Sequence, residues 1–218
     1  MFHFKKAIYL VVLIGYSLCN AGSYDDFFSA VKRDDAEAVR ALLNRGFDAN
    51  ALSPTGEHGL IIGIRESSLK VVAALMERPE IQVEVRNRND ESPLMMAALK
   101  GLTELCRQLI GRGADVNKPG WTPLHYAATN GHLEVMTLLL GEFAYLDATS
   151  PNGTTPLMMA AHYGTPLAVS LLLEAGADPM LQNLQGLRAL DFAQSANRRD
   201  SVEIIAAFIR GQHPKGTW

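Results

Sequence analysis

The segment WTPLHYAATNG (residues 121–131) carries the signals of one complete short helix. Thr122 offers a hydroxyl oxygen at an N-cap position, and Pro123 follows at the first helical position, where a missing N–H costs nothing. Gly131 stands where such a helix ends in a left-handed residue. We therefore predict a helix between Thr122 and Gly131. The threonine, histidine and tyrosine of this segment could also suggest an active site.

Related segments recur along the chain at nearly constant spacing. ESPLMMAALKG (91–101) and TTPLMMAAHYG (154–164) align with 121–131 without gaps, and weaker copies occupy 57–67 and 187–197. The aligned leucines are separated by 34, 30, 33 and 33 residues: Leu60, Leu94, Leu124, Leu157 and Leu190. Each copy is followed by an apolar second segment, and two of these lead into GADVN (113–117) and GADPM (176–180). Such a period indicates units that bury their faces against one another.

This pattern resembles the ankyrin repeat, with its period of about 33 residues and its T-P-L-H-x-A motif. The resemblance implies an all-α ankyrin-repeat solenoid of helix-turn-helix units with projecting β-hairpin or turn fingers, about six units including degenerate caps. The expected segments are a signal peptide (1–21), an N-terminal capping repeat (22–51), repeats at 52–85 (degenerate), 86–117, 118–148 and 149–181, a C-terminal capping repeat (182–211) and a tail (212–218).

The resemblance also assigns structural roles to single residues. It places His125 in the hydrogen-bond network of its turn, together with Thr122, so we expect no catalytic role for His125. Gly101, Gly131 and Gly164 are expected to end the first helix of their units in a left-handed conformation. The finger at 117–121 is three residues shorter than its neighbours, as the spacing of 30 shows.

The N-terminus has the layout of a secretory signal peptide. Lys5 and Lys6 precede an apolar run that is short for a membrane span, and Ala21 ends a small-residue cleavage site. The layout is bacterial, which predicts export to the periplasm, or secretion, and no membrane insertion after cleavage. The alternatives are an uncleaved anchor and lipidation at Cys19.

Composition excludes some classes of function. Apolar residues make up 48% of the chain and charged residues 20%, which predicts a packed core. Removing residues 1–21 with their two lysines leaves 18 of the 20 basic residues against 23 acidic ones, a net charge of −5. Nucleic-acid binding requires a basic excess and is not expected. No His or Cys pairs have zinc-ligand spacing, no cofactor is implied, and Cys106 is expected to be a buried, inert thiol.

Partners of ankyrin repeats usually meet the finger tips and the inner face of the first helices, so the variable positions of the pattern there are candidate contacts. These positions give Trp121, Tyr126, Tyr163, His162, Glu91, Lys100, Asn130, Arg65 and Thr154. Trp121 is the first choice because aromatic side chains dominate interface energetics. The competing interpretation is that Trp121 packs on its own turn. Tyr126 belongs to a Met and aromatic stripe that either packs between helices or lines a groove: Ile62, Met96, Tyr126, Met159 and Phe192.

We therefore expect a non-catalytic protein–protein interaction module, monomeric when free, that binds a partner protein through finger tips and concave face. Bacterial ankyrin proteins with signal peptides include immunity proteins and factors linked to periplasmic catalase, and the resemblance does not choose between them. A host-targeted secreted effector is the alternative. A metal-binding protein or an enzyme on the same scaffold is a further one.

Overall fold

The computed structural model describes residues 22–212. The predicted signal peptide and residues 213–218 of the predicted tail lie outside the described residues. The chain divides into two compact units, Met1–Asp90 and Glu91–Trp218, which are described separately below. Regular structure within the described residues is helical, as predicted. The fingers are turns, and a single bridge between Leu52 and His58 is the only β-pairing found in residues 22–212.

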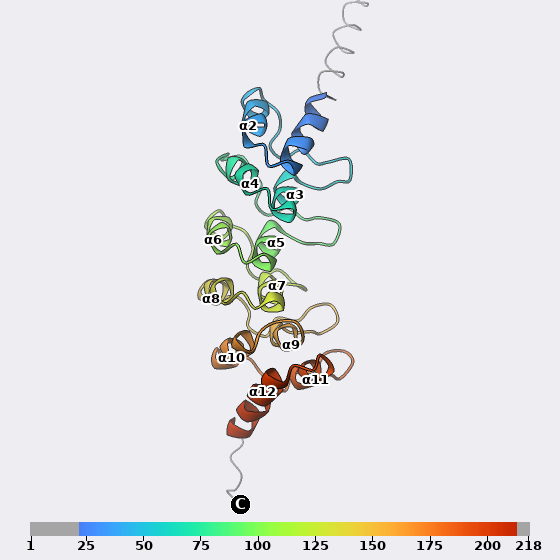
Figure 1. Ribbon diagram of the computed structural model, residues 1–218, viewed down its shortest axis with the longest axis vertical. Coiled ribbons are helices and arrows are strands. Elements are labelled where there is room, and N and C mark those ends of the chain that lie inside the picture. The colour runs from blue at the N-terminus through green and yellow to red at the C-terminus, as the bar shows by residue number, and fades with distance from the viewer. Residues whose placement is uncertain (1–21, 213–218) are drawn as a thin grey trace, which may run out of the picture. The chain divides into compact units, whose positions relative to one another are not determined.

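In the first unit, the helix over residues 22–32 is followed by three further helices (Figure 1). Aromatic rings fill the space between its first elements. The Phe27 ring stacks on Phe47 at 4.6 Å and meets Phe28 edge to face at 5.1 Å. α4 packs against both α2 and α3. The bounds of these helices are α2 Ala36–Asn44, α3 Gly59–Glu66 and α4 Leu69–Met76.

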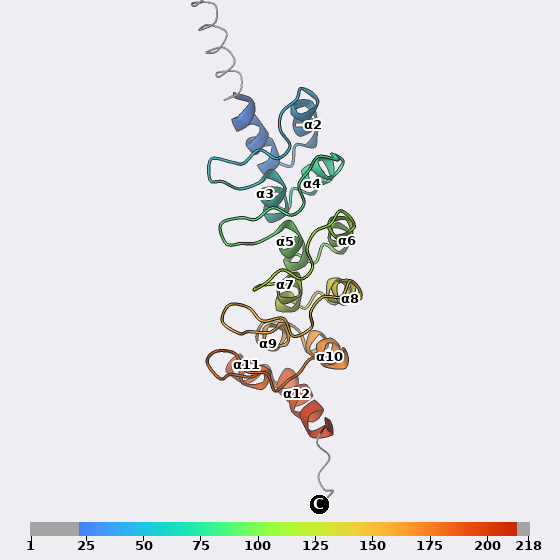
Figure 2. The same ribbon diagram turned by 180° about the vertical axis from the view of Figure 1, so that it is seen from behind.

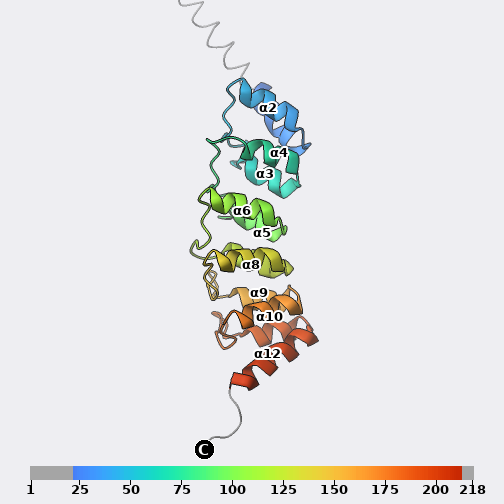
Figure 3. The same cartoon turned by 90° about the vertical axis from the view of Figure 1, so that its left-hand side faces the viewer.

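In the second unit, short first helices alternate with second helices, and each kind forms a row (Figures 1 and 2). The first row contains α5 Pro93–Leu99, α7 Pro123–Asn130, α9 Pro156–His162 and α11 Ala189–Ser195. The second row, which faces the viewer in Figure 3, contains α6 Thr103–Gly111, α8 Leu133–Gly141, α10 Pro166–Glu174 and α12 Arg199–Gln212. Neighbours within each row pack together, so each repeat buries its apolar faces on the next one.

The first helices begin as the sequence predicts. Ser92 Oγ accepts a hydrogen bond from the N–H of Met95 at 3.2 Å, and Thr155 Oγ1 accepts one from Met158 at 3.3 Å. In return, each methionine Sδ lies 3.4 Å from the backbone nitrogen of its capping residue. A thioether is a weak acceptor, so this half of the exchange is the weaker one.

His125 takes the same place in its repeat and adds a bond to the next repeat. Its Nδ1 accepts from the Thr122 backbone N–H at 3.2 Å, and its Nε2 donates to the Thr154 carbonyl oxygen at 2.9 Å. The ring is fully buried, and burial lowers its pKa to about 4. The imidazole is therefore neutral with its proton on Nε2. The structural role expected for His125 is confirmed.

The three glycines that follow α5, α7 and α9 are required for two different structural reasons. Gly101 and Gly131 adopt the predicted left-handed conformation, with φ of 69° and 67°. Gly164 does not, and the prediction for it is wrong. A Cβ at Gly164 would lie 2.4 Å from the carbonyl oxygen of Ala128 in the preceding repeat. Gly164 is required because α7 approaches too closely for any side chain.

The side chain that ends the GAD loop after α6 reaches the following loop. Asn117 Nδ2 donates to the Phe143 carbonyl at 2.8 Å, and Asn117 Oδ1 accepts from the Tyr145 N–H at 2.7 Å. The next repeat has Asp147 at this position, and its carboxylate only accepts from the Asp178 N–H, at 3.3 Å. Burial raises the pKa of Asp147 above its ordinary value; the hydrogen bond from the Asp178 N–H opposes this, and the nearby charge of Asp178 adds a smaller upward effect.

No helix within residues 22–212 is both long enough and apolar enough to cross a membrane.

The substitution His125→Met tests the polar link between repeats. The methionine can still accept weakly at the Nδ1 position, as in the neighbouring repeats, but the bond to Thr154 is lost. We expect the free energy of unfolding at pH 7 to fall by about 1–3 kcal/mol.

The deficit of this variant should depend on pH. The folded pKa of His125 is about 4 against an ordinary 6.5. As pH falls, the unfolded chain binds the proton first, so this histidine costs the native protein about 3 kcal/mol by pH 4. The variant lacks this loss, so its deficit shrinks or reverses between pH 7 and pH 5. Urea denaturation at both pH values measures it, and a constant deficit contradicts the assignment.

The substitution Asp147→Asn should stabilise the protein. Because the folded pKa of Asp147 is raised, the native state loses stability as pH rises through that pKa. We expect the asparagine to raise the free energy of unfolding at pH 7 by about 0.5–1.5 kcal/mol, and the gain to vanish near pH 3. Asp115→Asn, at an exposed position that keeps its acceptor role, is the matched control and should have little effect. Equal stability of Asp147→Asn and wild type at pH 7 would count against this interpretation.

Candidate protein-binding surface

Two predicted contact residues of neighbouring repeats are joined directly. The Tyr126 hydroxyl on α7 donates to Glu91 Oε1 at 2.9 Å, and both side chains are half-buried. Of the predicted Met and aromatic stripe, Met96 is buried, whereas Tyr126, Met159 and Phe192 keep part of their surface. The stripe therefore packs between helices and is also partly accessible in the second unit.

Tyr163 is the most exposed of the predicted aromatic residues, at 54%. Its ring meets the His162 ring edge to face, with centroids 4.1 Å apart. Arg198, which directly precedes α12, donates from Nη2 to the Tyr163 carbonyl at 3.1 Å and from Nε to the His162 carbonyl at 3.3 Å. Ser195 Oγ lies 3.5 Å from His162 Nδ1. We call His162, Tyr163, Ser195 and Arg198 the Tyr163 cluster.

The Tyr163 cluster combines an exposed aromatic ring with a guanidinium that is held in place. Both residue types are enriched among the residues that dominate binding energy. Because hydrogen bonds already restrict Arg198, little additional side-chain entropy is lost when a partner binds. Sequence analysis missed Arg198, because its partners are carbonyl groups more than thirty positions away in the chain.

Trp121 packs on its own turn and keeps part of its surface exposed. The indole meets the His125 ring edge to face at 5.2 Å. The short finger that precedes α7 is visible in Figure 2. Trp121 thus remains a candidate contact, but it also covers the buried His125.

The other predicted residues differ in their exposure and in the hydrogen bonds that they already make within the protein. Asn130 is exposed, yet its Nδ2 donates to the Leu99 carbonyl at 2.8 Å. Lys100 is half-buried. In the first unit, Arg65 pairs with Glu57, from Nη2 to Oε2 at 3.1 Å, and hydrogen bonding by Arg65 lowers the pKa of Glu57 below its ordinary value.

Thr154 was predicted as a contact residue, but the structure buries it. It is 2% exposed, its N–H donates to Ser150 Oγ at 3.0 Å, and its carbonyl receives the bond from His125. The finger folds over its own base here, which covers the threonine side chain. We therefore remove Thr154 from the candidate contacts.

His58 and Cys106 are both buried. Burial lowers the pKa of His58 to about 4 and raises the pKa of the Cys106 thiol to about 12. Within residues 22–212 there is no group of three His, Cys, Asp or Glu side chains that could hold a metal ion.

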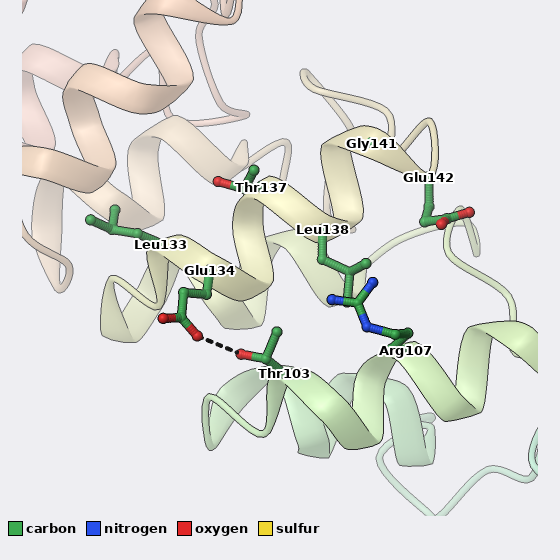
Figure 4. Close-up of a pocket in the computed structure, with 8 residues that line it drawn as sticks. All are labelled: Thr103, Arg107, Leu133, Glu134, Thr137, Leu138, Gly141 and Glu142. Atoms are coloured by element: carbon green, nitrogen blue, oxygen red, sulfur yellow. Dashed lines mark hydrogen bonds between the residues drawn. The ribbon is translucent and has the colours of Figure 1, made fainter.

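A shallow groove of about 540 Å³ lies between α6 and α8 (Figure 4). Thr103, Arg107 and Leu138 are on its walls, and Thr103 Oγ1 donates to Glu134 Oε2 at 3.3 Å across it. Glu142 lies at the end where α8 runs into the next loop. None of the predicted contact residues lines this groove.

Comparison with known proteins agrees with this architecture. The chain matches the family model for ankyrin repeats (three copies) over residues 79–149 and 138–215. A putative ankyrin repeat-containing protein of Treponema pallidum (strain Nichols) is 27% identical over 185 residues, which cover 80% of this chain and 60% of that protein. The nuclear factor NF-kappa-B p105 subunit of Gallus gallus is 32% identical over 72% of this chain, which spans only 17% of p105.

Two solved structures match over almost their full length. One is a chain in the complex of a predatory endopeptidase from Bdellovibrio bacteriovorus with an immunity protein. Its TM-score is 0.72 and its identity 26%, over 84% of this chain and 97% of that one. The other is an ankyrin repeat domain from Acinetobacter baumannii AYE, with a TM-score of 0.71 and 25% identity, over 84% and 96% of the two chains. The chain belongs to the ankyrin-repeat family, whose repeats form protein–protein interaction modules.

Proposed function

We propose that this protein is exported to the periplasm and there binds and inhibits a partner enzyme, as an immunity protein does. The observation that carries the proposal is the match to a chain of the endopeptidase–immunity protein complex, over 97% of that chain. The two molecules therefore offer the same repeat framework over nearly the same length. The signal-peptide pattern of residues 1–21 supports a destination outside the cytoplasm.

The Tyr163 cluster is the proposed centre of the contact, and Trp121 and Tyr126 extend it along the first helices. These side chains lie on successive first-helix units, so a partner that covers the row would meet all of them. Tyr163 is 54% exposed, whereas Trp121 and Tyr126 are half-buried and the Tyr126 hydroxyl is already bonded to Glu91. Tyr163 is therefore expected to contribute most to the binding energy.

Export is tested with Lys5→Glu/Lys6→Glu in a bacterial host. The substitution reverses the charge of the n-region, so we expect the mature form to disappear from the periplasmic fraction. Mass spectrometry should find the wild-type chain there, beginning at Gly22. A cytoplasmic full-length wild-type chain would contradict the export proposal, and a lipid on Cys19 would contradict cleavage after Ala21.

Binding is tested by crosslinked capture from periplasm with wild type, Tyr163→Ala and Trp121→Ala. We expect one dominant partner, a hydrolase whose activity falls when the purified protein is added. Tyr163→Ala should weaken its binding by at least about tenfold, which corresponds to about 1.4 kcal/mol. Calorimetry gives the affinity, and thermal melting shows whether Trp121→Ala also loses stability.

Leu167→Ala is the matched control for this experiment. Leu167 is 65% exposed but lies on α10, in the second row, so its removal should leave the affinity unchanged. Equal affinity of Tyr163→Ala and wild type would show that the Tyr163 cluster is not the contact. A captured partner whose activity is unaffected would contradict inhibition.

A further inference from the structure

At two positions, the loop that follows α8 departs from the loops after α2, α6 and α10; the loop after α4, which contains Pro79, also lacks the glycine and the aspartate. After α2, α6 and α10 the loop has glycine and aspartate two residues apart, with the glycine left-handed at φ of 90°, 89° and 101°: Gly46 and Asp48, Gly113 and Asp115, Gly176 and Asp178. After α8 the same positions hold Phe143 and Tyr145, and Phe143 has a φ of 60°. Sequence analysis missed this pair.

Both replacements remove a feature that stabilises the other loops. Residues with a Cβ are disfavoured in the left-handed region, and bulky ones most of all. The aspartate in the other loops accepts a hydrogen bond from the N–H two residues later, at 2.8 Å in each case. A tyrosine at this position has no oxygen within reach of that N–H, so the turn loses its side-chain cap.

Packing within the protein does not compensate for this loss. The Phe143 side chain is 83% exposed and Tyr145 is 66% exposed, and they are the most and third most exposed of the large apolar residues described. Their backbone is nevertheless fixed, because Asn117 bonds to the Phe143 carbonyl and to the Tyr145 N–H. The two rings are thus presented to solvent on an ordered loop.

The ionisable side chains around the pair are mainly acidic. Asp115 and Asp178 occupy the position of Tyr145 in the two adjacent loops, and Glu142 precedes Phe143; all three are exposed. The cations of these loops are less available, because Lys118 is 6% exposed and Arg112 is half-buried. Aromatic faces within an acidic setting attract a guanidinium or ammonium group.

The groove between α6 and α8 adjoins the pair, because Glu142 lines its end and is followed directly by Phe143 (Figure 4). Glu134 and Glu142 are acidic positions along the groove, and Arg107 lies between the two helices (Figure 4). A peptide whose cation meets the two rings could therefore continue over the groove.

We propose that Phe143 and Tyr145 anchor a second protein-binding surface, which takes an Arg- or Lys-bearing segment of a partner protein. The cationic group lies against the two rings between Asp115 and Asp178, and the segment continues along the α6–α8 groove. This surface is built from second helices and the loops after them, so it is distinct from the Tyr163 cluster on the first-helix row. A partner can occupy it whether or not the Tyr163 cluster is filled.

The variant Phe143→Gly/Tyr145→Asp tests the proposal, because it converts Phe-Ala-Tyr into the Gly-Ala-Asp found at 113–115 and 176–178. We expect the melting temperature to rise by roughly 2–8 °C, since both stabilising features return. A fluorescently labelled hexa-arginine peptide should bind the wild-type protein at low salt and bind the variant about 5- to 30-fold more weakly. Fluorescence anisotropy measures both affinities.

The added aspartate separates this proposal from attraction by surface charge alone. If acidic charge were sufficient, the variant would bind hexa-arginine as tightly as wild type or more tightly, and that result would overturn the proposal. A fall in melting temperature would also overturn it, because the rings would then have a packing role. Leu167→Ser and Tyr163→Ala are controls that should leave hexa-arginine binding unchanged.

Two further measurements address other occupants of this surface. A hexa-glutamate peptide should not bind, and equal binding of it would overturn the choice of a basic partner. Analytical ultracentrifugation should find the same monomeric mass for wild type and for Phe143→Gly/Tyr145→Asp. Dimerisation of the wild type that is lost in the variant would assign the surface to a second copy of the chain and overturn the proposal.

Discussion

The close approach of adjacent first helices is the constraint on which the second unit depends. Between α7 and α9 the backbones are so near that a Cβ at Gly164 would overlap the Ala128 carbonyl oxygen. Ala127 and Ala128 of α7 are fully buried, and their small side chains allow the close approach. Each helix needs its neighbour to bury these small faces. The free energy of unfolding of the second unit is therefore approximately a sum of contributions from single repeats and from the contacts between adjacent repeats. The paired alanines and the glycine follow from this geometry, independently of any chemistry.

Polar links hold the repeats in register once the helices are packed. His125 reaches the Thr154 carbonyl of the next repeat, whereas Met95 and Met158 at equivalent positions only accept weakly within their own turns. Among these three equivalent positions, the hydrogen bond to the next repeat is therefore made by the one that holds a histidine. A buried neutral imidazole can both accept and donate, which no apolar replacement can do. The histidine and threonine that suggest an active site in the sequence are parts of this link.

Local signals made much of the fold predictable from sequence. The helices begin after Ser92, Thr122 and Thr155, where a capping oxygen precedes a proline, and the role of His125 followed from the repeat pattern. Features that depend on how the fingers fold or on contacts between repeats were not predictable in this way. Thr154 is covered because its own finger folds back, and Gly164 is constrained by a carbonyl of another repeat.

The candidate site was predicted only in part for the same reason. The variable positions included Tyr163, whose exposure the structure shows, but its anchor Arg198 bonds to carbonyl groups that carry no sequence signal. Phe143 and Tyr145 were visible in the sequence. They were not predicted as contacts because the candidate positions were those that vary throughout the family, whereas this pair replaces a glycine and an aspartate that recur after α2, α6 and α10.

Repeats within one chain serve as controls for one another, and the loop after α8 fails that comparison three times in five residues. Phe143 replaces a left-handed glycine, Tyr145 replaces a capping aspartate, and Asp147 stands where other loops have a linking asparagine. The loop after α4 also lacks this glycine and asparagine, with Pro79 and Gln82 in this stretch, but it presents no exposed aromatic ring. In the loop after α8, Phe143 and Tyr145 exchange a stabilising feature for an exposed ring, and Asp147 adds a negative charge. Residues that weaken a fold in one place and share one surface chemistry are best explained by what that surface binds.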